Sequence, residues 1–286
     1  MSTCHLLASR RNRWIFLTHL VCVLGLFFLA IHAEAGCSRP IQVPVAVAGL
    51  NVVFKDNKYS GIMPDFLRLI ETKSNCRFVY YYVPKSRQEN LFESGNADLL
   101  IATVKTTRRE KLGTFISLVQ LRATVISIDD QHLAIQNVRD LFARSELRLV
   151  VVRAYDYGPG YQAILEEMNR QGRLTIEPDP VSVARTMLNN PRYVTIMAPT
   201  LFSGVVQTEA MLKPLIGKLR YDKLDELPWT ASGIYISNSA LNISDQIYLK
   251  AQLEKYAASD VVWKSYQSLY PPEVVKIGLR QRDTVP

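Results

Sequence analysis

The stretch 94-SGNADLLIATVKTTRREKLGTFIS-117 joins an apolar strand to a basic turn, and the fold prediction starts from it. Gly95 is typical of a helix end, and the segment 98–104, with its apolar run from Leu99, suits a strand that is covered on both faces of its sheet. Two threonines and the charged residues 108–111 follow at once. Because ligands of open α/β sheets bind beyond the carboxyl ends of strands, the turn at Arg109 is a candidate binding site. The alternative is a solvated run of charges.

Strands and helices alternate on both sides of this segment. Before it, the pattern predicts a strand at 41–50, a helix at 62–75, a strand at 77–83 and a helix at 86–95. After a β-rich stretch at 118–130, a second series follows: strand 147–152, helix 161–172, strand 174–178, helix 182–190 and strand 193–198. A strand at 233–237 and two helices then lead to Pro271 and Pro272, and a loose tail is expected at 276–286. The fold class is therefore α/β, with two successive units.

The composition is that of a globular protein. A chain of 286 residues with 48% hydrophobic and 21% charged residues can bury the core of one large or two modest domains. These proportions exclude disordered, fibrous and collagen-like chains. The formal net charge of +8 is a mild bias, and the sequence has no basic stripe interleaved with aromatic residues, so nucleic acid is not an expected partner.

Residues 1–35 have the features of a secretory signal peptide. Three arginines precede the apolar run 14–31, and small residues at Ala33 and Ala35 fit cleavage after Ala35, which would place the mature protein in the periplasm. Cleavage would lower the net charge from +8 to +6, because three arginines and one glutamate leave with the segment. The apolar run is nearly long enough to cross a bilayer, so an uncleaved membrane anchor is the alternative.

Two of the four cysteines, Cys37 and Cys76, lie in the mature chain. A pair of cysteines in an exported protein suggests a disulfide. Each cysteine directly precedes a predicted strand, so both thiols lie at one edge of the sheet if those strands are parallel neighbours. The alternative is two unpaired thiols, and no neighbouring histidine marks either as a nucleophile.

Motifs of metal, nucleotide and hydrolase chemistry are missing from the sequence. It contains no cluster of metal ligands, no glycine loop of the phosphate-binding kind and no nucleophile elbow. No cofactor is therefore expected.

From about residue 40 to 272, the chain resembles the bacterial extracellular solute-binding proteins of family 3, the polar amino acid receptors of ABC transporters. The resemblance lies in the order of four blocks: YSGIMPDFLRLIETKSNCRFVYYYVP, LFESGNADLLIATVKTTRREKLGTFIS, LRLVVVRAYDYG and LEKYAASDVVWKSYQSLYP. The second block is the most diagnostic, because it keeps the helix-Gly-x-x-Asp-strand pattern, the Thr-x-x-Arg turn and the Phe and Ser that follow.

The resemblance implies a type II periplasmic binding protein, with two α/β lobes joined by two hinge strands and a ligand held between them. Lobe 1 would be discontinuous, with residues 37–120 and 233–275, and lobe 2 would be residues 121–232. Hinges would lie near 119–125 and 229–234, and hinge bending would close the cleft on the ligand.

It also implies a set of ligand-binding positions. Arg109 matches an arginine that, in the family, pairs with the ligand carboxylate. A guanidinium suits this role because its fork of N–H groups fits two carboxylate oxygens. Arg153 matches a second basic position, and the helix that follows Gly158 offers N–H groups to an anion. The candidate ligand-binding residues are Arg109, Thr106, Arg153, Tyr155, Asp156 and Ala102, although a threonine or aspartate in a turn more often caps it.

The sequence departs from the family where the ligand amino group would bind. The acidic position of the second lobe falls at Ala198, that of the first strand falls near Ala46, and the stacking aromatic falls near Gly49 or Leu50. Val104 stands where the family has a threonine. A buried ammonium without a partner costs several kcal/mol, so a standard free amino acid does not fit these positions.

The function expected from these features is capture of a small polar or anionic, carboxylate-bearing solute by a periplasmic monomer, for an ABC permease or a sensor. An interaction or sensor module with a degenerate cleft is one alternative. An enzyme similar to cyclohexadienyl dehydratase is another, but the cleft residues offer few general acids or bases, and the protein is not expected to be an enzyme.

Overall fold

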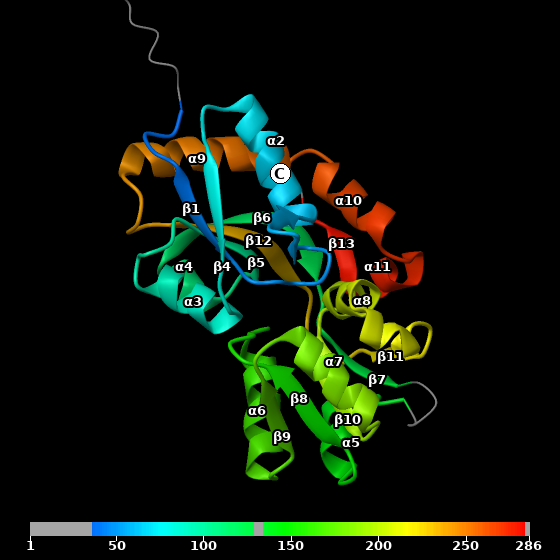
Figure 1. Cartoon of the computed structure of the whole chain (residues 1–286). Helices are drawn as coiled ribbons and strands as arrows, with labels where there is room; N and C mark the ends of the chain where they lie inside the picture. The colour runs from blue at the N-terminus through cyan, green and yellow to red at the C-terminus, as the bar shows by residue number, and fades with distance from the viewer. Residues whose placement is uncertain (1–35, 129–133, 284–286) are drawn as a thin grey trace, which may run out of the picture. The chain divides into compact units, whose positions relative to one another are not determined.

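The computed structural model describes residues 36–128 and 134–283, and the residues from Gly36 onward form one compact unit (Figure 1). The predicted signal peptide and the alternative membrane anchor lie outside the described residues. Within the described ranges, every helix is too short or too polar to cross a bilayer.

One lobe is built on a four-stranded antiparallel sheet and a parallel pair of strands. The sheet has the order β13-β6-β12-β5, and β1 pairs with β4. The strands of this lobe are β1 (Ile41–Val45), β4 (Phe78–Tyr82), β5 (Leu99–Val104), β6 (Gly113–Leu121), β12 (Thr230–Ser237) and β13 (Leu279–Gln281). A separate hairpin consists of β2 (Val53–Lys55) and β3 (Lys58–Ser60). Its helices are α2 (Ile62–Lys73), α3 (Lys85–Glu93), α4 (Thr107–Glu110), α9 (Ile243–Ala257), α10 (Val261–Leu269) and α11 (Pro272–Gly278). We call this part the first lobe.

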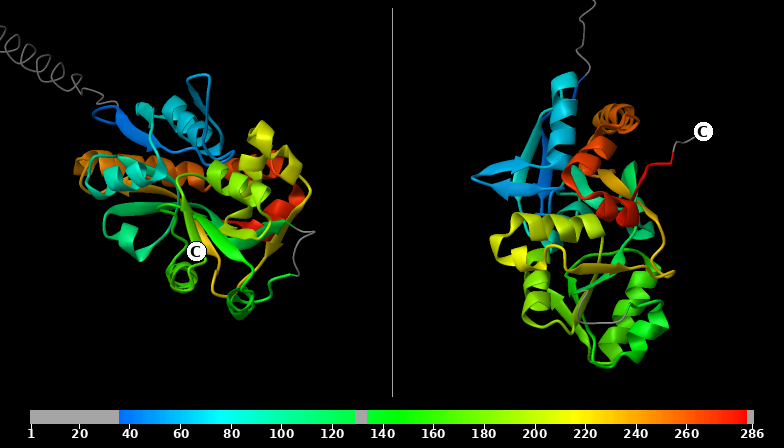
Figure 2. Two further views of the ribbon diagram at one scale, coloured as in Figure 1. Left: turned by 60° about the horizontal axis from the view of Figure 1, so that its bottom comes forward. Right: turned by 90° about the vertical axis from the view of Figure 1, so that its right-hand side faces the viewer.

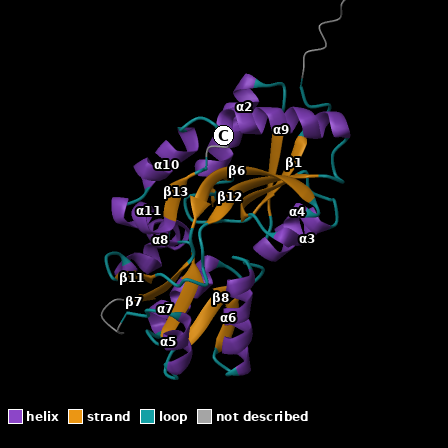
Figure 3. Ribbon diagram, turned by 180° about the vertical axis from the view of Figure 1, so that it is seen from behind, coloured by secondary structure: helices purple, strands orange, loops and turns teal. Residues whose placement is uncertain are grey.

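The second lobe is built on a five-stranded mixed sheet of order β11-β7-β10-β8-β9. Its strands are β7 (Thr124–Ile128), β8 (Arg148–Val152), β9 (Leu174–Glu177), β10 (Tyr193–Met197) and β11 (Leu219–Asp222). Its helices are α5 (Val138–Ala143), α6 (Pro159–Arg170), α7 (Pro180–Asn189) and α8 (Pro199–Thr208), with a 3-10 helix at Ala210–Leu215. Figure 3 shows helices flanking the sheets of both parts of the chain.

Buried side chains divide into a shared core and a smaller one. The larger cluster includes Phe66 of α2, Ile116 of β6 and Phe202 of α8, and so continues from the first lobe into one face of the second. A separate cluster with Leu149 and Tyr161 fills the space between the second sheet and α6. The two lobes therefore share apolar packing on the α8 side.

The predicted disulfide is present: Cys37 is bonded to Cys76. As expected from the sequence, β1 and β4 are parallel neighbours, so the two cysteines that precede them lie at the same end of the pair. The bridge closes a loop between residues 39 positions apart.

The C-terminal residues are not a loose tail up to Asp283, so this expectation was wrong. Pro271 and Pro272 do not end the packed region; they begin α11, where a proline at the first helical position loses no hydrogen bond. Strand β13 then pairs with β6, and the segment lies beside the chain crossings in the views of Figure 2.

The chain passes between the lobes twice, at residues 122–123 between β6 and β7 and at residues 223–229 between β11 and β12. The first crossing lies in the predicted hinge 119–125, whereas 229–234 is mostly within β12. Two guanidinium groups lie against the Trp229 ring: Arg280 is 4.0 Å and Arg122 is 5.2 Å from its centroid. Cation–π contacts of this kind are each worth about 0.5–1 kcal/mol when exposed.

Candidate functional site

A small cavity lies between the two lobes, with a free volume of about 50 Å³. That is room for a few water molecules, at about 10–15 Å³ each. First-lobe residues in its wall are Asn51, Lys85, Ala102, Thr103, Val104, Arg109, Leu121, Ser232 and Tyr266; second-lobe residues are Tyr155, Asp156, Tyr157, Ala198, Thr200 and Leu201. Four of the six predicted site residues are therefore brought together: Ala102, Arg109, Tyr155 and Asp156.

The strand end that carries Ala102 is irregular. Ala102 has a left-handed backbone (φ 51°), and the pairing of β5 with β12 shifts register next to it. Ala154 has the same conformation (φ 65°) just after β8, next to Tyr155 of the opposite wall. A left-handed alanine costs about 1–2 kcal/mol, and strain of this kind gathers at functional sites. The backbone is thus left-handed near the end of each of the two strands, β5 and β8.

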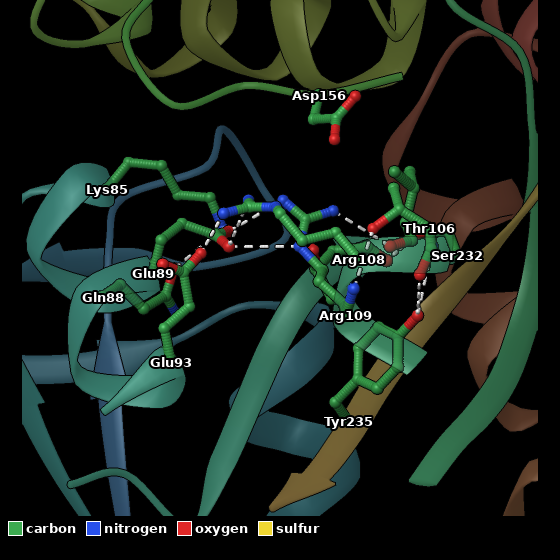
Figure 4. Close-up of polar contacts among 12 residues, drawn as sticks. Lys85, Gln88, Glu89, Glu93, Thr106, Arg108, Arg109, Asp156, Ser232 and Tyr235 are labelled. Atoms are coloured by element: carbon green, nitrogen blue, oxygen red, sulfur yellow. Dashed lines mark hydrogen bonds and ion pairs between the residues drawn. The ribbon is translucent and has the colours of Figure 1, made fainter. Parts of the chain in front are cut away.

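Arg109 is almost fully buried, with 1% of its surface exposed. Its Nε and Nη2 donate to the two carboxylate oxygens of Glu89 at 3.1 and 2.9 Å, and its Nη1 donates to the carbonyl of Val104 at 3.1 Å (Figure 4). The solvated-charge alternative is therefore wrong for this residue. The guanidinium edge expected to receive a ligand carboxylate holds a carboxylate of the chain itself.

Lys85 shares the same carboxylate. Its Nζ lies 2.9 Å from Glu89 Oε1 and donates to Gln88 Oε1 at 3.0 Å. Burial alone would raise the pKa of Glu89, but the charges of Lys85 and Arg109 outweigh it and lower that pKa to about 2. Burial lowers the pKa of Lys85, and the charge of Glu89 opposes this.

A row of tyrosines forms the facing wall in the second lobe. The Tyr157 ring makes edge contacts with Tyr155 and Tyr161, at centroid distances of 6.2 and 5.2 Å. The Tyr157 hydroxyl accepts a hydrogen bond from the Ala198 amide at 3.3 Å. Burial raises the pKa of all three phenols far above their ordinary value, so they stay neutral hydrogen-bonding groups.

Asp156 also lines the cavity from the second lobe. Its Oδ1 accepts hydrogen bonds from the Gly158 amide at 2.9 Å and from Gln162 Nε2 at 3.1 Å. In Figure 4 its carboxylate is directed toward the arginines of the first lobe. The amide of Gly158, the N-cap of α6, is thus bound by Asp156.

The other two predicted site residues lie elsewhere. Thr106 is the N-cap of α4: its Oγ1 accepts the Arg109 amide hydrogen at 3.3 Å, as turn threonines commonly do. Arg153 is exposed and lines a separate, outer groove. Neither residue belongs to the described wall of the cavity.

Sequence reasoning missed Lys85, Glu89 and Asn51. The pair Lys85 and Glu89 looks like a solvated i,i+4 pair on a polar helix, and only the docking of Arg109 buries it. Asn51 Oδ1 is buried without a hydrogen-bond partner among the described residues. An acceptor of this kind in a cavity wall is a typical ligand contact, but one asparagine in a loop gives no sequence signal.

The missing aromatic at Gly49 has a steric explanation. Gly49 has φ 56°, and a Cβ there would lie 2.6 Å from the Leu201 carbonyl of α8. A Cβ at Gly204 would lie 2.6 Å from the Leu50 amide. The space that a stacking side chain would use is therefore filled by the backbone of α8.

No protein-family model matches the chain, and no curated protein matches its sequence. Solved structures match its fold. A histidine kinase sensor domain with similarity to periplasmic binding proteins has 16% identity and a TM-score of 0.61, with 85% of this chain and 98% of that chain covered. An ancestral arginine-binding protein bound to glutamine has 14% identity and a TM-score of 0.62, with 81% and 97% covered.

An amino acid ABC transporter substrate-binding protein from Streptococcus pneumoniae, bound to L-arginine, matches at 13% identity and a TM-score of 0.59 over 84% of this chain and 95% of that chain. At these identities the matches show the fold. The chain therefore has the two-lobed α/β fold of the periplasmic binding proteins, as its resemblance to the family 3 solute-binding proteins implied.

Proposed function

We propose that the protein is a periplasmic solute-binding protein that captures a small carboxylate-bearing ligand in the cavity between its lobes, for an ABC permease or a sensor. The observation that carries the proposal is the charge of the first-lobe wall. Two buried cations, Lys85 and Arg109, share one carboxylate, that of Glu89, so the wall keeps one positive charge. A singly charged carboxylate would neutralise it in a site with little water.

A second contact supports a ligand that also donates hydrogen bonds. Asn51 lines the cavity, and its buried Oδ1 is an acceptor without a partner among the described residues. Asp156 adds an acceptor on the opposite wall. The hydroxyl or amino group of a hydroxy acid or an amino acid could donate hydrogen bonds to these acceptors. Asp156 would then take the role of the acidic residue that the family has at the position of Ala198.

The small free volume implies that the lobes must separate before a ligand enters. Opening at the crossings 122–123 and 223–229 would achieve this, and closure would then bury the ligand. The close packing of α8 on Gly49 opposes such a motion, so the ligand would have to offset the cost of opening.

The experiment is a thermal-shift screen with carboxylates, followed by calorimetry on the best compound, with Lys85→Met as the variant. This change removes the surplus charge and leaves the Glu89–Arg109 pair intact. We expect affinity to fall about 10- to 100-fold, the range for a charge-assisted hydrogen bond. Lys250→Met, an exposed position on α9, is the control. An unchanged affinity in Lys85→Met would refute the proposal.

The interaction module remains a second candidate, because Glu89 already fills the Arg109 fork and the cavity is small. Mass spectrometry of small molecules released from protein purified without refolding separates the two. The enzyme alternative is less favoured by the geometry. Glu89, which pairs with two cations of the cavity wall, has a pKa of about 2 and so does not donate a proton at neutral pH.

A further inference from the structure

An outer groove continues the cavity along the edge of the second lobe. Its free volume is about 490 Å³, and it shares Tyr155 and Asp156 with the inner cavity. Arg108 borders it on the first lobe, and Arg153 and Gln162 border it on the second. The groove is much roomier than the cavity, so a ligand anchored in the cavity has space to extend outward past Asp156.

The two arginines of the groove differ in their bonding. Arg108 forms ion pairs with Glu93 and, at 3.7 Å, with Glu89. The Arg153 side chain has no hydrogen-bond or ion-pair partner among the described residues, and it is exposed. Its backbone is fixed, because its amide donates to the Glu177 carbonyl at 2.8 Å and the left-handed Ala154 follows it. Arg153 is thus a free cation on a fixed strand end.

The side chains from the cavity to the groove carry charges of alternating sign, and the outer part also has an apolar wall. The inner end has the surplus positive charge of Lys85 and Arg109, Asp156 is negative at the junction, and Arg153 is positive at the outer end. The floor beside Arg153 includes the apolar side chains of Leu165 and Ile176, and 51% of Ile176 is exposed. The sequence of charges is plus, minus, plus, with an apolar wall along the outer part.

We infer that the ligand is an elongated amino dicarboxylate that spans both compartments. One carboxylate binds at Lys85 and Arg109, the amino group lies near Asp156, and the second carboxylate binds Arg153. The methylene chain packs on Leu165. Arg153 then selects for the second carboxylate. This inference rests on the proposed function, because the inner carboxylate uses the same site.

Calorimetry with two compounds of equal chain length tests the role of Arg153. 2-Aminoadipate and norleucine differ in the terminal carboxylate, and the wild type should bind 2-aminoadipate at least about 10-fold more tightly. Arg153→Gln should abolish this preference without weakening norleucine binding. Arg139→Gln, an exposed arginine of α5 in the same lobe, is the matched control and should keep the preference.

Charge reversal gives a second, gain-of-function readout. Arg153→Glu should shift the preference from 2-aminoadipate toward lysine, which carries a terminal ammonium. Equal binding of 2-aminoadipate and norleucine by the wild type, or a preference that survives Arg153→Gln, overturns the inference and leaves the proposed function standing. Failure of every carboxylate to bind, or binding that is indifferent to Lys85→Met, overturns the proposed function and the inference with it.

Discussion

Replacing Glu89 by glutamine should leave two buried cations without their common carboxylate. Lys85 Nζ and Arg109 Nη2 both lie 2.9 Å from Glu89 Oε1, and the side chain of Glu89 is only 4% exposed. Removing one partner of a buried ion pair typically costs about 3–5 kcal/mol, because the remaining charge is neither solvated nor paired. Glutamine keeps the shape of the side chain, so the loss should be electrostatic.

The pKa of Glu89 gives an independent magnitude. A fall from an ordinary 4.5 to about 2 corresponds to about 3 kcal/mol of folding free energy. Because the folded pKa lies below the unfolded one, this contribution is fully present above about pH 4.5 and is lost as the pH falls toward 2. This value agrees with the lower end of the range for a broken buried ion pair, so about 3 kcal/mol is the expected cost of Glu89→Gln.

Urea unfolding followed by circular dichroism measures this cost. At neutral pH, Glu89→Gln should lower the free energy of unfolding by about 3 kcal/mol, and the difference from wild type should vanish as the pH approaches 2. Glu93→Gln, which removes an exposed carboxylate on the same helix, should change it by less than about 1 kcal/mol. A loss below about 1 kcal/mol for Glu89→Gln, or a difference independent of pH, would refute the reasoning.

Three further outcomes are expected. Replacing both Cys37 and Cys76 by serine should cost up to about 4 kcal/mol in urea unfolding, because the bridge closes a loop between residues 39 apart; no change would mean that the bridge is not formed in the protein. Ala102→Gly should raise the unfolding free energy by up to about 1 kcal/mol, since glycine adopts φ 51° without strain, and a clear fall would contradict this. Trp229→Ala should cost about 1–2 kcal/mol through the loss of both cation–π contacts, whereas a melting temperature equal to that of wild type would exclude such a contribution.

The sequence predicted the alternating elements and the disulfide well, because both depend on local patterns. The strand predicted at 98–104 is β5 (Leu99–Val104), and the parallel pairing of β1 with β4 brought the cysteines together. The helix α8 and the short strands β11 and β13 were missed. These elements depend on tertiary packing, which a local pattern does not show. Most residues of α8 are buried, and β13 forms by pairing with β6.

The candidate site was predicted in position and only partly in chemistry. Arg109 was found because it follows a strand end, but the residue that pairs with it lies on a helix whose charged pattern suggests full solvation. The spacing of Lys85 and Glu89 is that of a surface ion pair, and no local signal indicates that a third charge covers them. Burial of charge is decided by tertiary contacts, so the sequence alone could not show it.

The position of Trp229 provides an intrinsic optical probe. Of the three tryptophans, Trp14 lies in the predicted signal segment, Trp263 lies in α10 and Trp229 immediately precedes β12, at the second crossing. Guanidinium groups held against an indole alter its emission, so any rotation of the lobes that shifts Arg122 or Arg280 would register as a change in fluorescence. Ligand titrations could then be followed in unlabelled protein, with Trp263 as an internal reference.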